Sequence, residues 1–197
     1  MSEDEKDLIL HLQQRFALYG DMKAYKQLFE MLYNPLFTFS YSFVRSKEAA
    51  EEIVSDVFIK LWSIKAELLG INNLKVYLYT IAKNFSLNYI TRHRKASVIS
   101  LEDLDSAAFF NSGNPESSFI SNEIINRLNQ AILELPSQCQ LIFYLVKECD
   151  FKYKEVASIL NISANTVRNQ IAIATKKIAD SLPMSIKSNF VSHFSES

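Results

Sequence analysis

Apolar side chains recur every three or four residues along most of the chain, which is the repeat of a helix that buries one face. On this pattern residues 3–19 predict a first helix, and the aromatic-rich residues 21–44 predict a second. We expect a break in the second helix near Asn34-Pro35, because proline removes a backbone donor and clashes with the preceding turn.

Ser46 is expected to start the next helix, because its hydroxyl can accept a free amide of the first turn. That helix corresponds to KEAAEEIVSDVFIKLWSI, residues 47–64, and the following segment ELLGINN, residues 67–73, predicts a loop. A further long helix is predicted from Leu74 to about Arg94. It carries large side chains at four-residue steps that we interpret as mostly core: Tyr77, Ile81, Phe85 and Tyr89.

The composition changes at residues 96–121, which are rich in serine and acids, contain no basic residue and predict a flexible acidic linker. Helical periodicity resumes at residue 122 and stops before Pro136, which is expected to open another helix through about Glu148. Glycine and proline are too scarce for many tightly turned strands. The sequence therefore predicts an all-α fold of two small helical domains, with these bounds: 1–95, the linker 96–121, 122–185 and a tail at 186–197.

The segment DFKYKEVASILNISANTVRNQIA, residues 150–172, contains two helical patterns separated by three residues. Asn161 can adopt the left-handed conformation that ends a helix, Ile162 is expected to fill the interior, and Ser163 can cap the second helix. Ala157 is small, as a close helix crossing requires. This pattern indicates a helix-turn-helix, whose second helix can enter a DNA major groove.

The second helix of this motif is expected to bury one face and expose another. The buried face is predicted to be Val167, Ile171, Ala174 and Ile178. The outward residues near its start suit contacts with base edges and phosphates: Asn165, Thr166, Arg168 and Asn169. The pair Lys176-Lys177 adds cations further along. The alternative is a plain helical hairpin with a solvated face.

The net charge of −1 conceals alternating blocks of charge. Residues 74–95 carry five Lys or Arg and no acid, residues 96–150 carry eight acids and two bases, and residues 151–187 carry six bases and two acids. Two basic blocks suit two contacts with an anionic polymer.

The polar N-terminus and the lack of a long apolar run predict no signal peptide and no direct membrane insertion. Cys139 and Cys149 form no metal or redox motif, and as idle thiols they favour a cytoplasmic location.

Three segments resemble, in order, those of extracytoplasmic-function (ECF) sigma factors of the sigma-70 family. EEIVSDVFIKLW is similar to their core-binding helix, and LKVYLYTIAKNFSLNYITRHRK to the helix that reads and melts the −10 element. LPSQCQLIFYLVKECDFKYKEVASILNISANTVRNQIAIATKKI resembles their −35-reading domain. The resemblance implies a sigma-2-like domain at 1–95 and a sigma-4-like domain at 122–185. Family members often have Gly where Asp150 and Asn161 stand, and Arg or Lys where this chain has Ala172 and Ile173.

The resemblance implies a sigma factor that binds core RNA polymerase and directs promoter-specific initiation, with no bond chemistry of its own and no cofactor or metal. The residues expected to bind the polymerase are Asp56, Ile59, Lys60 and Trp62. Those expected to bind the −10 strand are Lys75, Lys83, Asn84, Asn88, Arg92 and Arg94, and those for the −35 element are Tyr153, Asn165, Thr166, Arg168, Asn169 and Lys176. A loop at about residues 65–73 would help to form a pocket for an unpaired base. The implied partners are the polymerase, promoter DNA and a cognate anti-sigma factor.

Several alternatives remain open at the level of sequence. Phe58 and Trp62 can be core side chains alone, and the basic helix can be a solvated face. The linker acids either mimic phosphate in a basic channel or simply keep the linker soluble. As a whole, the chain could instead be a helix-turn-helix regulator not associated with core polymerase, or a helical adaptor. An enzyme fits least, because no phosphate loop, Cys/His pair or converging acid cluster is evident.

Overall fold

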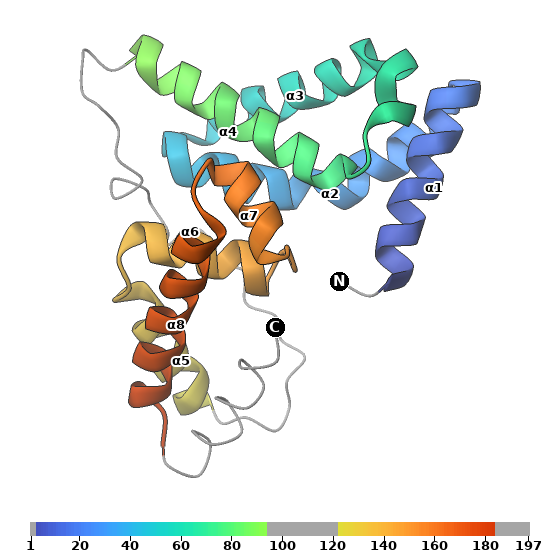
Figure 1. Cartoon of the computed structure of the whole chain (residues 1–197). Coiled ribbons are helices and arrows are strands. Elements are labelled where there is room, and N and C mark those ends of the chain that lie inside the picture. Colours follow the sequence, from blue (N-terminus) through green and yellow to red (C-terminus); the bar gives the residue numbers. More distant parts are fainter. Residues whose placement is uncertain (1–2, 94–121, 184–197) are drawn as a thin grey trace. The chain divides into compact units, whose positions relative to one another are not determined.

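The computed structural model describes residues 3–93 and 122–183, and every element of regular secondary structure within these ranges is a helix, as the sequence predicted. The elements are α1 (Glu3–Tyr19), α2 (Met22–Val44), α3 (Lys47–Ser63), η1 (Lys65–Gly70), α4 (Leu74–His93), α5 (Asn122–Leu133), α6 (Ser137–Lys147), α7 (Tyr153–Leu160) and α8 (Ala164–Ser181). None of the helices in the described part of the chain is long and apolar enough to span a membrane. Figure 1 labels the helices α1 to α8.

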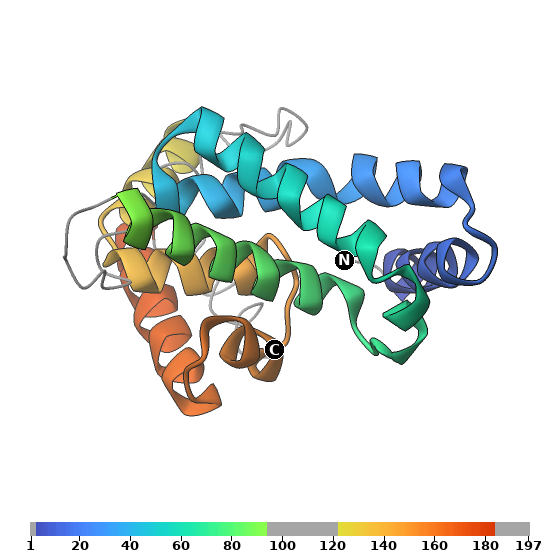
Figure 2. The ribbon, with the colours of Figure 1, turned by 90° about the horizontal axis from the view of Figure 1, so that it is seen from above.

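The chain divides into two compact units, of which the first is built by α1 to α4 with η1. In this unit α2 is central and packs against α1, α3 and α4, while α3 and α4 also pack against each other. Figure 2 shows α3 and α4 running alongside α2, with α1 crossing near its beginning. The core contains these fully buried side chains: Leu12, Phe16, Leu28, Leu32, Leu36, Phe39, Leu61, Leu68, Leu74, Leu78 and Tyr79.

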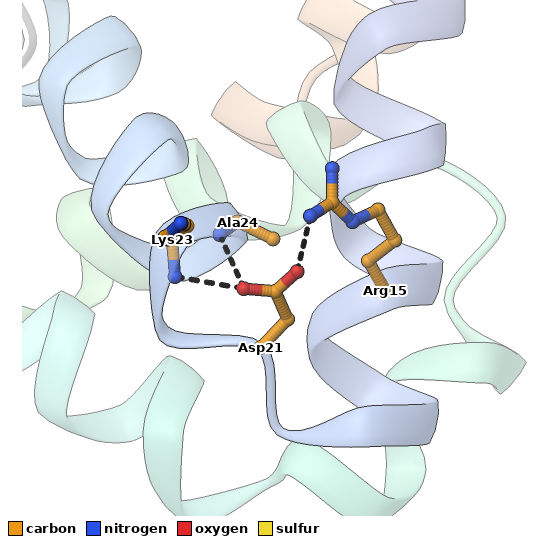
Figure 3. Close-up of polar contacts among 4 residues, drawn as sticks. All are labelled: Arg15, Asp21, Lys23 and Ala24. Carbon is orange, nitrogen blue, oxygen red and sulfur yellow. Dashed lines mark hydrogen bonds and ion pairs between the residues drawn. The ribbon is translucent and has the colours of Figure 1, made fainter.

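Polar side chains cap the beginnings of α2 and α3. The carboxylate of Asp21 accepts hydrogen bonds from the amides of Lys23 at 2.8 Å and Ala24 at 3.3 Å, and it forms an ion pair with Arg15 on α1 (Figure 3). The Arg15 guanidinium holds the pKa of Asp21 below its ordinary value, with the two capping amides adding to the effect. Ser46 caps α3 as predicted.

Two predictions about helix boundaries are wrong. Pro35 lies inside α2, which continues without a break to Val44. Proline removes one helical hydrogen bond, but Leu32 and Leu36 on either side are buried, and this packing holds the helix together. Residues 67–70 of the segment expected to be a loop belong instead to the 3-10 helix η1, because Leu68 is fully buried and anchors them to the core, whereas residues 71–73 are not helical.

The second unit is built chiefly by α5 to α8, with α8 packing against α6 and α5. Every residue of α6 from Cys139 to Val146 is buried. Both cysteines are buried, and neither forms a disulfide. Burial raises the pKa of Cys139 to about 11, and its Sγ donates to the carbonyl of Gln170 at 3.2 Å. The thiol therefore stays protonated at neutral pH and contributes to packing.

The turn of the helix-turn-helix has the predicted geometry. Asn161 has a φ of 58° and Asp150 a φ of 53°, so both adopt the left-handed conformation in which glycine is favoured. The amide of Thr166 donates to the Ser163 hydroxyl at 2.9 Å, which caps α8. Ile162 is only half-buried, so it fills the interior less completely than expected.

The predicted linker at 96–121 and the tail at 186–197 lie outside the described residues. The role of the linker acids and the domain boundaries therefore remain predictions.

Candidate functional site

The α3 helix presents a mixed apolar and charged surface. Asp56, Ile59 and Lys60 are all exposed, and Ile59 exposes 65% of its surface. Beneath them Val57 and Leu61 are fully buried. One side of α3 therefore belongs to the core, while the other offers an apolar side chain between two opposite charges, which suits a protein partner.

Trp62 contributes to both sides. Its ring packs against Phe16 and Tyr25, with centroid separations of 5.4 and 5.2 Å, yet 46% of the residue is exposed. Phe58, in contrast, is buried. Of the two aromatic residues for which a core role alone was the alternative, Phe58 is core and Trp62 is also a surface residue.

The sequence reasoning missed an apolar extension of this surface on α2. Met22 and Phe29 are exposed, and together with Tyr25 and the stems of two lysines they line a shallow groove of about 470 Å³. Phe29 packs on Phe58 with a centroid separation of 4.7 Å, which links the groove to α3. The aromatic density of residues 21–44 was the available signal, but periodicity alone did not reveal which of these side chains are exposed.

The α4 helix exposes polar residues on one face. Asn84, Asn88 and Arg92 are exposed, and their spacing of four residues places them along a single stripe. Lys75 and Lys83 are only 8% exposed and do not contribute to this accessible stripe. Burial lowers the pKa of Lys83. Arg94 lies outside the described residues.

The aromatic stripe predicted to be core does not form the core of α4. Tyr77, Ile81, Phe85 and Tyr89 are half-buried, and the ring of Tyr89 stacks on that of His93. The fully buried side chains of α4 include instead Leu74, Leu78, Tyr79, Ala82 and Ser86. Large side chains lie on both sides of α4, so apolar spacing alone could not distinguish them. The polar stripe consequently has partly accessible aromatic rings beside it, a combination that suits unstacked bases.

The α8 helix buries the face that was predicted and exposes the other. Val167, Ile171, Ala174 and Ile178 are buried. Asn165, Arg168, Asn169 and Lys176 are exposed. Thr166 is half-buried, and its hydroxyl lies 2.8 Å from that of Ser163, so part of its hydrogen-bonding capacity serves the cap.

The two lysines of the pair in α8 have different surroundings. Both lysines are exposed, but Lys177 donates to the carbonyl of Glu134 at 2.8 Å and so satisfies the end of α5. Tyr153, at the start of α7, is half-buried and lies between the exposed residues Lys152 and Lys154. These two cations were not among the predicted site residues, although the basic composition of 151–187 was a signal for them. No group of three or more potential metal-ligating side chains occurs within residues 3–93 and 122–183.

Comparisons with known proteins find a similar family for each of the two units. Residues 28–96 match the Sigma-70 region 2 family, and residues 125–178 match Sigma-70, region 4. The chain is 27% identical over 154 residues to the ECF RNA polymerase sigma factor SigM of Bacillus subtilis, covering 77% of this chain and 91% of that protein. It is 26% identical over 166 residues to the ECF RNA polymerase sigma-E factor of Escherichia coli K12, covering 81% and 86% respectively.

One solved structure has the same fold. CnrH, in complex with the cytosolic domain of CnrY, is 18% identical to this chain with a TM-score of 0.51, and the match covers 90% of this chain and 96% of CnrH. Both halves of the chain thus match sigma-70 regions in the family's order, and relatives of similar length are ECF sigma factors. This protein belongs to the ECF sigma factors of the sigma-70 family, which direct RNA polymerase to promoters.

Proposed function

We propose that this sigma factor binds core RNA polymerase through α3, with Asp56, Ile59, Lys60 and Trp62 at the contact. The observation that carries this proposal is the exposure of Ile59 between two charged side chains on a helix whose other face is core. A partner that covers Ile59 and the exposed side of the Trp62 indole buries apolar surface, which favours binding. The charges of Asp56 and Lys60 fix the orientation of that partner. An ordinary helix-turn-helix regulator would have no need for this surface.

The proposed −10 contact lies along α4. Asn84 and Asn88 offer amide donors and acceptors to base edges, and Arg92 offers a cation to the backbone. The half-buried Phe85 beside them offers a ring edge to an unpaired base. Lys75 and Lys83 are buried, so they can contact DNA only if DNA binding exposes their amines. The proposed −10 contact does not depend on them.

The proposed −35 contact lies on α8. Arg168 and Asn169 are placed to reach base edges, and Asn165 and Lys176 extend the same exposed face toward phosphates. Ala172 and the exposed Ile173 replace cations on this helix, so we expect the second unit to bind DNA weakly and with strong salt dependence by itself. Linking it to the polymerase-bound first unit makes its contact intramolecular and raises the effective affinity.

A regulatory protein that covers these surfaces is the further partner we propose. CnrH, which shares the fold, is known in complex with the cytosolic domain of CnrY. The exposed polar stripes of α4 and α8 need to be open for promoter binding, so a protein that covers them would hold the factor inactive. We place this exchange in the cytoplasm, where core polymerase and the chromosome are found. The chain itself serves as an initiation factor and leaves RNA synthesis to the polymerase.

Site-specific photo-crosslinking tests the three surfaces in one experiment. A photoreactive residue would replace Ile59, Asn88 or Arg168, with exposed Leu10 on α1 as the control position. In a promoter complex we expect crosslinks to polymerase, to −10 DNA and to −35 DNA, respectively, and none of these from position 10. A crosslink from position 168 to DNA, without a crosslink from position 59 to polymerase, would instead support a helix-turn-helix regulator that does not bind the polymerase.

A further inference from the structure

The side chain of Gln13 on α1 is buried, with 2% of the residue exposed, and it donates two hydrogen bonds to the segment before α4. Its Nε2 lies 2.6 Å from the carbonyl oxygen of Leu68 and 2.9 Å from that of Ile71. The Leu68 carbonyl also accepts the backbone amide of Ile71 at 3.0 Å, so the Gln13 amide is its second donor. The same amide nitrogen donates to the carbonyl of Ile71, the residue that follows η1, and so joins both ends of this turn to α1. Burying an amide is costly without such bonds, so the contact specifies one position for this segment.

The α1 helix that carries Gln13 is fixed at its other side. Arg15 forms an ion pair with Asp21, the residue that caps α2 (Figure 3). Gly20 closes the turn between the helices with a φ of 65°, and a Cβ at this position would lie 2.7 Å from Nζ of Lys65, where η1 begins. The segment 65–73 is therefore held by a helix whose own position is fixed.

The segment 65–73 leads directly into α4, the helix that carries the polar stripe of Asn84, Asn88 and Arg92. Asn73 Oδ1 accepts the amide of Val76 at 3.1 Å and so caps the start of the helix. Before it, Leu69 and Asn72 are exposed. An amide side chain can discriminate a base edge by its donor and acceptor, and an apolar side chain can contact the face of an unstacked base.

We propose that Gln13 is a positioning residue for promoter selectivity. It holds the segment 65–73 so that Leu69 and Asn72 contact a base of the strand bound along α4. The inference rests on the proposed −10 function of α4 and on the base pocket that the resemblance implies at about residues 65–73. What it adds is a determinant in α1, Gln13, which lies outside the region 2 match at residues 28–96. Replacing the Gln13 amide should change which bases are preferred while leaving polymerase binding intact.

The test uses holoenzyme assembled from the full chain and bacterial core polymerase. The probes are fluorescent single strands carrying the −10 sequence of a promoter this holoenzyme uses, together with every single-base change. Gln13→Met removes both hydrogen bonds and keeps most of the volume, while Gln14→Met makes the same change at the exposed neighbouring position. Asn72→Ala alters the proposed contact without disturbing the core.

We expect Gln13→Met to lose roughly tenfold discrimination at one or two base positions, the scale of one good base contact. Asn72→Ala should lose discrimination at the same positions, and Gln14→Met should match the wild type. An unchanged preference profile, or equal weakening on every strand, would overturn the role of Gln13. If Gln13→Met does not fold, the Asn72→Ala variant decides. An unchanged base-preference profile in that variant would overturn the proposal that Gln13 positions Asn72 against a base. A wild-type holoenzyme that prefers no strand would instead contradict the −10 function of α4.

Discussion

The ring of Trp62 meets that of Tyr25 edge to face, with centroids 5.2 Å apart, and this contact orients the exposed part of the indole. The Tyr25 hydroxyl in turn donates to the carbonyl of Phe58 at 3.0 Å, which ties α2 to α3. Burial raises the pKa of Tyr25, so the phenol keeps the proton for this bond. The polymerase surface proposed on α3 therefore has rigid aromatic support.

Replacing Trp62 with Ala is expected to reduce both stability and polymerase binding. The residue is about half-buried, so loss of its packing should lower the free energy of unfolding by about 2 kcal/mol. Urea unfolding measures the first effect, and titration of labelled core polymerase measures the second. Trp62→Phe keeps an aromatic ring and should recover most of the stability. Full polymerase affinity in the Ala variant would remove Trp62 from the contact.

Exchanging Asp56 and Ile59 together for Arg should weaken polymerase binding without unfolding the chain. Both side chains are exposed, so the far-ultraviolet circular dichroism and the unfolding midpoint should stay near wild type. The change removes apolar area and reverses one charge at the proposed contact, for which we expect at least a tenfold loss of affinity. Gln27→Arg with Glu30→Arg, on exposed positions of α2, is the control for added positive charge. Normal core affinity in the α3 variant would refute the assignment of this helix.

Arg168→Ala should impair use of the cognate promoter through its upstream element. A good base contact contributes about 1–3 kcal/mol, so transcription should fall while polymerase binding is unaffected. Footprinting of the promoter complex would show reduced protection over the −35 region. Lys177→Ala serves as the comparison, because Lys177 satisfies a carbonyl at the end of α5 and should affect stability instead. Unchanged −35 protection would exclude Arg168 from the site.

The Asp21 ion pair predicts an acid-dependent loss of stability. The pKa of the Asp21 carboxyl is lowered on folding, so its contribution is present above the ordinary value of 3.8 and is lost as the pH falls through the lower folded pKa. Asp21→Asn keeps a capping oxygen but cannot ionise, so its stability should fall less steeply below about pH 4. Urea unfolding across this range measures the difference. Arg15→Gln should flatten the acid dependence as well, and parallel pH curves for wild type and Asp21→Asn would contradict the prediction.

Local signals predicted the helix boundaries well wherever a single side chain decides them. Ser46 and Ser163 cap helices as expected, and Asn161 adopts the left-handed conformation that its position indicated. Pro35 was misjudged because the burial of its neighbours, a tertiary effect, outweighs a local penalty. The 3-10 helix before α4 was missed for the same reason, since Leu68 and the distant Gln13 hold it in place.

The candidate surfaces were predictable in composition and less so in orientation. On α8 the apolar spacing is unambiguous, so Arg168 and Asn169 are exposed as expected. On α4 the predicted DNA contacts followed the charges along the sequence, which do not reveal the helix face. Lys75 and Lys83 lie on the buried side. The groove lined by Met22 and Phe29 required knowledge of how α2 packs on α3, which a single sequence does not contain.

Run-off transcription with purified core polymerase, on genomic fragments from the source organism, tests the central claim most directly. We predict a discrete new start site that depends on this chain and disappears with the double Arg variant at Asp56 and Ile59. The promoter so identified would supply the strands needed for the Gln13 experiment. No specific transcript, together with no binding to core polymerase, would contradict the claim that this chain directs transcription initiation.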